Sequence, residues 1–251
     1  MPTDISPNTK REMLAKTAKI YDPLGLVSPV TLQAKLLFRD CCDVKLSWDK
    51  ELPQQLKDIP TIYQNCTKYR RFPGKHTLAD ACSYGVGAIV VAIVHHVSVT
   101  NKGLVASNLR LAKKDLTIPR LELLSEHMAT NLVHNVKEAL DGFPISNVFG
   151  WLDSTVALHW IRNGGSEDLK QFVGNQVRKI QEKNYILRHI PGQDTPIDIA
   201  SRGGKVREEN HLWWKGSKWS TTKEYWPEHN QSNRRGSQPQ QPTRVWQKQN
   251  P

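Results

Sequence analysis

The sequence predicts an α/β protein with a mixed five-stranded sheet that is flanked by helices. Residues 86–94 form a continuous apolar run rich in Val and Ile, which is typical of a strand covered on both faces. Residues 119–140 instead place apolar side chains at spacings of three and four, which predicts a long amphipathic helix. Strand-like and helical segments then alternate along the chain, and this alternation favours parallel crossover connections.

The chain before the sheet is predicted to be helical. Residues 10–20 carry apolar side chains with helical periodicity. The turn at residues 22–25 ends this helix, because its proline disfavours helix before it and its glycine tolerates the reversal. A second helix is predicted over residues 29–43. Residues 44–76 are mixed in composition and interrupted by prolines, so we interpret residues 1–76 as one helical and connecting segment.

The sheet is predicted within residues 77–228. Its strands are expected at residues 77–80, 86–94, 103–111, 147–153 and 185–190. Its helices are expected at residues 119–140, 156–162 and 169–181, with a last one that begins near Pro196. The resulting order, β-β-β-α-β-α-α-β-α, joins three hairpin-linked strands to later crossovers and so predicts a mixed sheet. Residues 229–251 hold six Gln, four Lys or Arg and no acid, so we expect a disordered tail there.

The composition excludes several classes of protein. The 251 residues, 38% of them apolar, are enough for a real core and argue against a fibrous or fully disordered chain. The longest apolar run, residues 86–94, is far shorter than a bilayer requires, so we expect no membrane partner. The four cysteines form no CxxC pair, which argues against a zinc ribbon or a redox motif. No signal-peptide pattern is present, so we expect the protein in the cytoplasm or the nucleus.

The formal net charge of +11 lies in the flanks of the chain. Residues 77–203 carry 13 Lys and Arg against 12 Asp and Glu. The corresponding counts are 13 against 8 for residues 1–76, and 9 against 4 for residues 204–251. Basic arms around an acid-balanced middle suit a protein that grips a polyanion and presents carboxylates to it. A basic, well-solvated surface with no such role is the alternative.

Four acidic residues are candidates for a metal-dependent site. Asp80 and Asp153 end two strands that we expect to be parallel neighbours, and sites in such sheets form beyond the carboxyl ends of the strands. Glu122 lies in the first predicted turn of the long helix, and Asp198 opens the last helix. Phosphodiester hydrolysis with two divalent ions requires several converging carboxylates. Each acid alone also has a structural explanation, as a turn former at a strand end or as a charge favoured by a helix dipole.

Two groups of basic residues are candidates for contacts with a nucleic-acid backbone, against the alternative of ordinary solvated charge. One group lies between the third strand and the long helix and consists of Lys113, Lys114 and Arg120. The other, Lys215 and Lys218, lies in the tryptophan-rich segment 213–226. Its tryptophans can stack on bases, but we favour packing on the domain as a C-terminal clasp, because Trp buries a large area.

Six stretches of the chain carry a specific sequence pattern. They are KREMLAKTAKIYDPLGLVSPVTLQAK at 10–35, LADAC at 78–82, LTIPRLELL at 116–124, WLDSTVALHWI at 151–161, HIPGQDTPIDIASRG at 189–203 and the Trp-rich pattern up to Pro227. Together they span residues 10–227. This pattern resembles the segment between reverse transcriptase and integrase in Pao/BEL-type LTR retrotransposon polyproteins. Cys82 stands where the family usually has Ser, and Thr195 to Asp198 stand where it usually has Asn-Pro-Ala-Asp.

The resemblance implies an RNase H fold that hydrolyses the RNA strand of an RNA–DNA hybrid. It implies that two Mg²⁺ ions, with Mn²⁺ as the alternative ion, bind Asp80, Glu122, Asp153 and Asp198. It further implies that residues 1–76 derive from reverse transcriptase, that the remaining reverse transcriptase is a partner, and that virus-like particles in the cytoplasm are one location. The alternative, suggested by the departures from the family pattern, is an inactive nucleic-acid-binding remnant or connection domain of a degenerate element.

Overall fold

The structure is a computed structural model that describes most of the chain. It describes residues 7–53, 75–95, 100–141, 148–164, 170–192, 195–201, 210–221, 224, 226 and 227. Most of the predicted connector, and the tail predicted over residues 229–251, lie outside the described residues.

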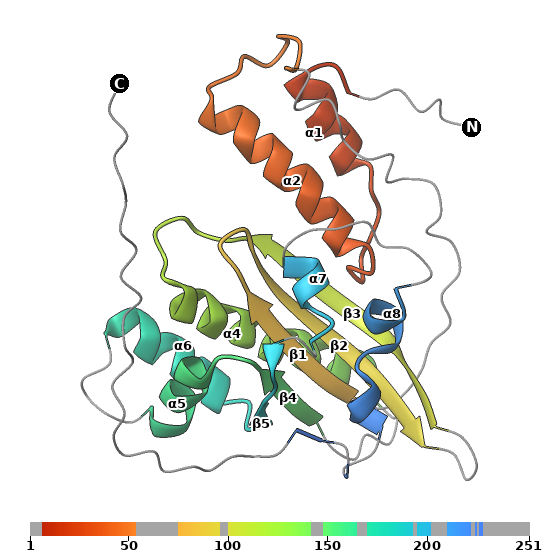
Figure 1. Ribbon diagram of the computed structural model, residues 1–251, viewed down its shortest axis with the longest axis vertical. Coiled ribbons are helices and arrows are strands. Elements are labelled where there is room, and N and C mark those ends of the chain that lie inside the picture. Colours follow the sequence, from red (N-terminus) through yellow and green to blue (C-terminus); the bar gives the residue numbers. More distant parts are fainter. Residues whose placement is uncertain are drawn as a thin grey trace, which may run out of the picture.

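Five strands form one mixed sheet, as predicted (Figure 1). They are β1 (Lys75–Ala81), β2 (Gly85–His95), β3 (Thr100–Leu111), β4 (Val148–Leu152) and β5 (Ile186–His189). Their order across the sheet is β3-β2-β1-β4-β5. The first three strands pair antiparallel, β4 joins β1 in parallel, and β5 joins β4 in parallel. The apolar run that predicted a buried strand is the centre of β2, where residues 88–92 are almost completely buried.

Three helices pack on one face of the sheet. They are α4 (Ile118–Ala139), α5 (Thr155–Asn163) and α6 (Gln171–Gln181). Helix α4 lies on β1 and β2, where Leu121 and Met128 form one apolar cluster with Val86 and Ala88. Proline occupies the first turn of α4, where its missing amide hydrogen costs nothing. Ser154 caps α5 by accepting a hydrogen bond from the amide of Ala157 at 3.1 Å.

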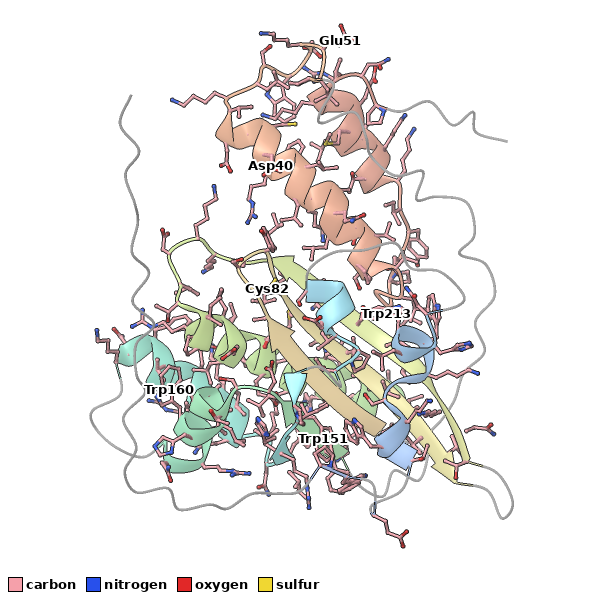
Figure 2. All side chains as sticks on the ribbon, viewed as in Figure 1. Asp40, Glu51, Cys82, Trp151, Trp160 and Trp213 are labelled. Carbon is pink, nitrogen blue, oxygen red and sulfur yellow. The ribbon has the colours of Figure 1, made fainter. Side chains whose placement is uncertain are left out.

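The other face of the sheet is covered by segments from both ends of the chain. Helix α2 (Ser28–Asp43) supplies Leu32 to the core that also contains Ile89, Trp151 and Trp213. Trp213 belongs to α8 (His211–Lys215), and its indole Nε1 donates a hydrogen bond to the carbonyl of Leu26 at 3.1 Å (Figure 2). Helix α7 (Asp198–Ser201) lies between α2 and strands β1 and β2 (Figure 1). The segment before the sheet therefore shares a core with it.

The turn between α1 (Lys10–Ala18) and α2 docks directly on β3. The carboxylate of Asp22 accepts hydrogen bonds from the amides of Leu26 at 2.8 Å and Val27 at 2.9 Å, which closes the turn. Gly25 has a φ of 70°, and a Cβ there would lie 1.9 Å from the carbonyl oxygen of Ser107. Only glycine combines this backbone conformation with so close an approach. The same glycine that ends the predicted first helix thus allows the N-terminal segment to contact the sheet.

Within the described residues, none of the helices is both long enough and apolar enough to span a lipid bilayer.

Candidate active site at the carboxyl end of the sheet

Asp80 and Asp153 emerge from adjacent parallel strands at the same level. Ala79 of β1 pairs with Leu152 of β4. Asp80 and Asp153 are the next residues along the chain, so their backbones lie side by side at the carboxyl ends of the two strands. This is the arrangement predicted from the sequence for the two strand ends. The backbone of Asp80 pairs with Gly87 of β2, while its side chain lies outside the described part of the structure.

The segment after β5 lies against Asp153. Asp153 is half-buried, and its Oδ1 atom is fully buried. A Cβ added to Gly192 would lie 3.0 Å from Oδ2 of Asp153, so a side chain at position 192 would crowd this carboxylate. Nε2 of His189 lies 3.1 Å from the main-chain carbonyl oxygen of Asp153, at hydrogen-bonding distance. Gly192 was not predicted as part of the site, although a glycine three residues after the end of the last strand was a signal for a close approach.

Glu122 lies on α4 between two leucines that pack on different parts of the site. The helix begins at Ile118, one residue before the predicted start, so Glu122 begins its second turn rather than lying in the first. Leu121 is in the cluster of Ala81, the residue after Asp80. Leu123 is in the cluster of Leu152, the residue before Asp153. Glu122 itself is half-buried and lies between these two leucines in the sequence of α4, the helix that contacts both β1 and β4.

Asp198 is the first residue of α7, and α7 is attached to the ends of β1 and β2. Ile197 is fully buried, and a Cβ at Gly87, the partner of Asp80, would lie 3.1 Å from its side chain. At the other end of α7, the thiol of Cys82 donates a hydrogen bond to the carbonyl of Ser201 at 3.0 Å (Figure 2). Two of the three departures from the family pattern, Cys82 and Ile197, therefore make contacts that hold α7 at the carboxyl end of β1, while the third, Thr195, is buried just before α7.

The donor set suits Mg²⁺, while the described side chains do not complete a metal site. The four candidates are carboxylates, the hard oxygen donors that Mg²⁺ prefers. The missing Cβ at position 192 leaves room beside Oδ2 of Asp153. Among the side chains that the structure describes, no three His, Cys, Asp or Glu lie close enough together to hold a metal ion. Glu122, Asp153 and Asp198 thus do not form such a group by themselves, and Asp80 remains the predicted fourth member.

A fifth acid, Glu126, lies one helical turn after Glu122 and was not predicted. It is 1% exposed, and burial raises the pKa of its carboxyl group to about 8. Its nearest described partner is the hydroxyl of Thr130, 3.5 Å from Oε1. The apolar periodicity of residues 119–140 predicted the helix but not this burial, since the buried residues of α4 also include Ser125, Glu126 and Thr130. The spacing of four from Glu122 was the available signal.

The basic residues before α4 lie at the same end of the sheet as the carboxylates. The amide of Ala112 donates to the carbonyl of Tyr84 at 3.0 Å, which places the start of this loop beside the turn between β1 and β2. Lys113 is exposed, and Arg120 is half-buried in the first turn of α4. Lys114 is also exposed and forms an ion pair with Asp43 of α2 at 2.6 Å.

Lys215 and Lys218 lie at the opposite end of the sheet from the carboxylates. They lie on either side of Ser217, whose carbonyl accepts a hydrogen bond from Lys102 Nζ at 2.7 Å. Burial, and then the charges of Lys215 and Lys218, lower the pKa of Lys102. Lys102 pairs with Ile93 in β2, six residues from Gly87, which pairs with Asp80. Lys215 and Lys218 are therefore far from the candidate carboxylates, although they follow the motif that contains Asp198 in the sequence.

The tryptophan-rich segment packs on the sheet. Trp213 is fully buried, and Trp214, Trp219 and Trp226 pack against the same core. The rings of Trp219 and Trp226 approach Trp151 of β4 edge-on, with centroids 4.5 Å and 5.3 Å away. These contacts confirm the predicted C-terminal clasp, in which the tryptophan rings pack on the core of the domain.

The sheet order, the crossovers and the acids at the strand ends define an RNase H-like α/β domain. The family model described as "Pao retrotransposon-like RNaseH-like domain" matches residues 9–154, more than half of the chain. The chain belongs to this family. The match includes Asp80, Glu122, Asp153 and the N-terminal helices, while Asp198 lies beyond it.

No curated protein matches the chain. Three solved structures are similar to parts of it. RNase H1 from the halophilic archaeon Halobacterium salinarum NRC-1 has a TM-score of 0.33 and 12% identity, over 47% of this chain and 86% of that one. LC11-RNase H1 in complex with an RNA/DNA hybrid has a TM-score of 0.30 and 13% identity, over the same shares. Thermus thermophilus RuvC has a TM-score of 0.27 and 14% identity, over 55% of this chain and 76% of that one.

Proposed function

We propose that this chain is a ribonuclease H that hydrolyses the RNA strand of an RNA–DNA hybrid with the help of two Mg²⁺ ions. The observation that carries the proposal is the parallel register of β1 and β4, which places Asp80 and Asp153 side by side at two strand ends. Family membership supports the same function. Manganese is the alternative ion, because its ligand preference is close to that of magnesium.

Asp80, Glu122, Asp153 and Asp198 would hold the ions. The chemistry supplied on binding is positive charge at the attacking water and at the leaving 3′ oxygen. The two strand-end aspartates are rigidly spaced by the hydrogen bonds between β1 and β4, so their backbones need no rearrangement for binding. Glu122 and Asp198 approach from α4 and α7, so the site draws on three separate layers of the fold.

The substrate is selected by contacts outside the carboxylates. Lys113 and Arg120, at the same end of the sheet as the carboxylates, would contact backbone phosphates of the hybrid, and such contacts position a duplex without reading its sequence. Preference for RNA would come from hydrogen bonds to the 2′-hydroxyl groups beside the cut. The reverse transcriptase portion of the element would be the partner that delivers the hybrid.

The test is cleavage of a labelled RNA–DNA hybrid by the purified chain with and without Mg²⁺. We expect Mg²⁺-dependent cleavage of the RNA strand and its loss in Asp153→Asn, whereas Asp141→Asn, a change at an exposed acid after α4, retains it. Equal background in wild type and Asp153→Asn refutes the proposal. Salt-sensitive binding of the hybrid without cleavage would instead identify an inactive nucleic-acid-binding domain.

A further inference from the structure

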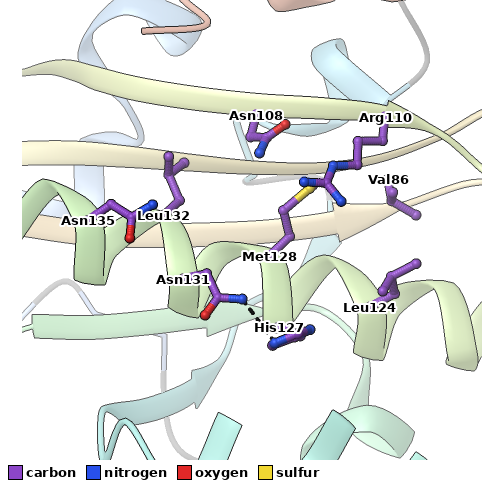
Figure 3. Close-up of a pocket in the computed structure, with 9 residues that line it drawn as sticks. All are labelled: Val86, Asn108, Arg110, Leu124, His127, Met128, Asn131, Leu132 and Asn135. Carbon is purple, nitrogen blue, oxygen red and sulfur yellow. Dashed lines mark hydrogen bonds between the residues drawn. The ribbon is translucent and has the colours of Figure 1, made fainter. Parts of the chain in front are cut away.

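A polar pocket lies between α4 and the edge strand β3 (Figure 3). Its volume is about 180 Å³. The apolar part of its wall comes from Val86, Leu124, Met128 and Leu132. The polar part comes from Asn108, Arg110, His127, Asn131 and Asn135. None of the four candidate carboxylates lines the pocket, and its lining residues include no Asp or Glu.

The polar groups of this pocket favour an anionic ligand. Arg110 brings a permanent positive charge, and the three asparagines bring amide donors. His127 lies 2.9 Å from the amide of Asn131 through Nε2, which orients both side chains (Figure 3). Burial lowers the pKa of His127, and the positive charges of Lys179 and Arg110 lower it further, against a hydrogen bond with Gln176 that raises it.

The pocket lies near the carboxyl end of β1, because Val86, which lines it, pairs with Ala81. Arg110 pairs with Val86 in the register of β2 and β3. Ala112, two residues after Arg110, lies further towards the carboxyl end of β1. Its amide donates a hydrogen bond to the carbonyl of Tyr84 at 3.0 Å. Tyr84 lies in the turn that follows β1, and its side chain is 56% exposed. A large exposed aromatic ring thus follows the end of β1, two residues before Val86 of the pocket.

We infer that the α4–β3 pocket binds a backbone phosphate of a nucleic-acid strand and that Tyr84 stacks on a base of the same strand. Arg110 pairs with the phosphate, and the asparagine amides donate to phosphate and sugar oxygens. The contacts are independent of sequence, because none of these groups needs a base edge. This inference rests on the proposed function, since it identifies where the substrate continues beyond the carboxylates.

The test is fluorescence anisotropy of a labelled RNA–DNA hybrid that carries a single-stranded extension, titrated with the full chain in EDTA at several salt concentrations. Arg110→Gln is expected to weaken binding roughly tenfold and to reduce the slope of log affinity against log salt by about one. The matched control is Arg178→Gln, a change at an exposed arginine of α6 that does not line the pocket, and it should leave the slope unchanged. Tyr84→Ala should weaken binding at least about fivefold, and Tyr84→Phe should restore it. Thermal melting of each variant checks that it folds.

The outcomes separate this inference from the proposed function. A folded Arg110→Gln chain with the same salt slope as wild type and Arg178→Gln overturns the pocket inference, even if the wild type cleaves the hybrid. A Tyr84→Ala chain that binds like wild type overturns the stacking contact. A wild-type chain that cleaves no hybrid but shows the Arg110 effect refutes the proposed hydrolysis and retains the phosphate site.

Discussion

Glu126 makes the stability of this domain depend on pH between about 4.5 and 8. Its carboxyl group is buried at 1% exposure, and its pKa rises from 4.5 in the unfolded chain to about 8. The folded state therefore holds a proton in this range that the unfolded state has lost. The contribution is fully present below pH 4.5 and is lost as the pH rises to about 8, for a total of up to about 5 kcal/mol.

The perturbation that isolates this effect is Glu126→Gln, which keeps the size of the side chain and stays neutral at every pH. The free energy of unfolding is measured by urea titration of tryptophan fluorescence at pH 5, 6, 7 and 8. The variant should gain stability relative to wild type by roughly 2–3 kcal/mol between pH 6 and pH 8. The control Glu138→Gln changes an exposed acid on the same helix that lies 3.3 Å from His134, and it should stay within about 1 kcal/mol of wild type.

A constant difference between Glu126→Gln and wild type across this range refutes the reasoning. It would mean that the carboxyl group ionises with its ordinary pKa, and hence that water or a cation reaches it in the folded state.

Three further predictions concern the attachment of the site to the fold. Leu32→Ala removes a fully buried side chain and should lower the free energy of unfolding by about 2–5 kcal/mol in a urea titration, whereas Leu24→Ala, at a half-exposed position, should change it little. Cys82→Ala removes the hydrogen-bond donor to the Ser201 carbonyl of α7 and should raise the Mg²⁺ concentration for half-maximal cleavage. Cys82→Ser keeps a donor, so its value should stay near that of wild type. Equal values for the two variants contradict this prediction. Gly192→Ala places a methyl group 3.0 Å from Oδ2 of Asp153 and should reduce cleavage roughly 10-fold with an unchanged melting temperature. Full activity of Gly192→Ala would show that this carboxylate is not a ligand.

The strands and long helices were predictable because their signals are local. The apolar run at residues 86–94 became β2 (Gly85–His95), and the periodic stretch at residues 119–140 became α4 (Ile118–Ala139). The parallel pairing of β1 and β4 also followed from the order of elements, because a crossover through α4 leaves few alternatives. The predicted pairing was enough to place Asp80 and Asp153, two of the four candidate carboxylates, next to each other at the carboxyl end of the sheet.

Features that depend on contacts between distant segments were not predictable in the same way. The polar pocket combines residues of β3 and α4 that are individually ordinary. Lys215 and Lys218 follow the Asp198 block in the sequence, yet they flank Ser217, which contacts Lys102 far from the strand end that carries Asp80. Glu126 is a charged residue at a position whose burial is set by the helices around it, while its own polarity predicts exposure.

The candidate site depends on the helices that precede the sheet. Helix α7 has four residues, far fewer than an isolated helix needs to be stable in water, so tertiary contacts determine where it lies. Those contacts are the packing of Ile197 on β2, the hydrogen bond from Cys82 to Ser201, and α2, whose Leu32 lies in the same core as Ile197. A chain that lacks α2 would therefore expose the outer side of α7 and loosen the position of Asp198. For this reason the unit that carries the site extends from the N-terminal helices through α8, and the sheet by itself does not fix the fourth carboxylate.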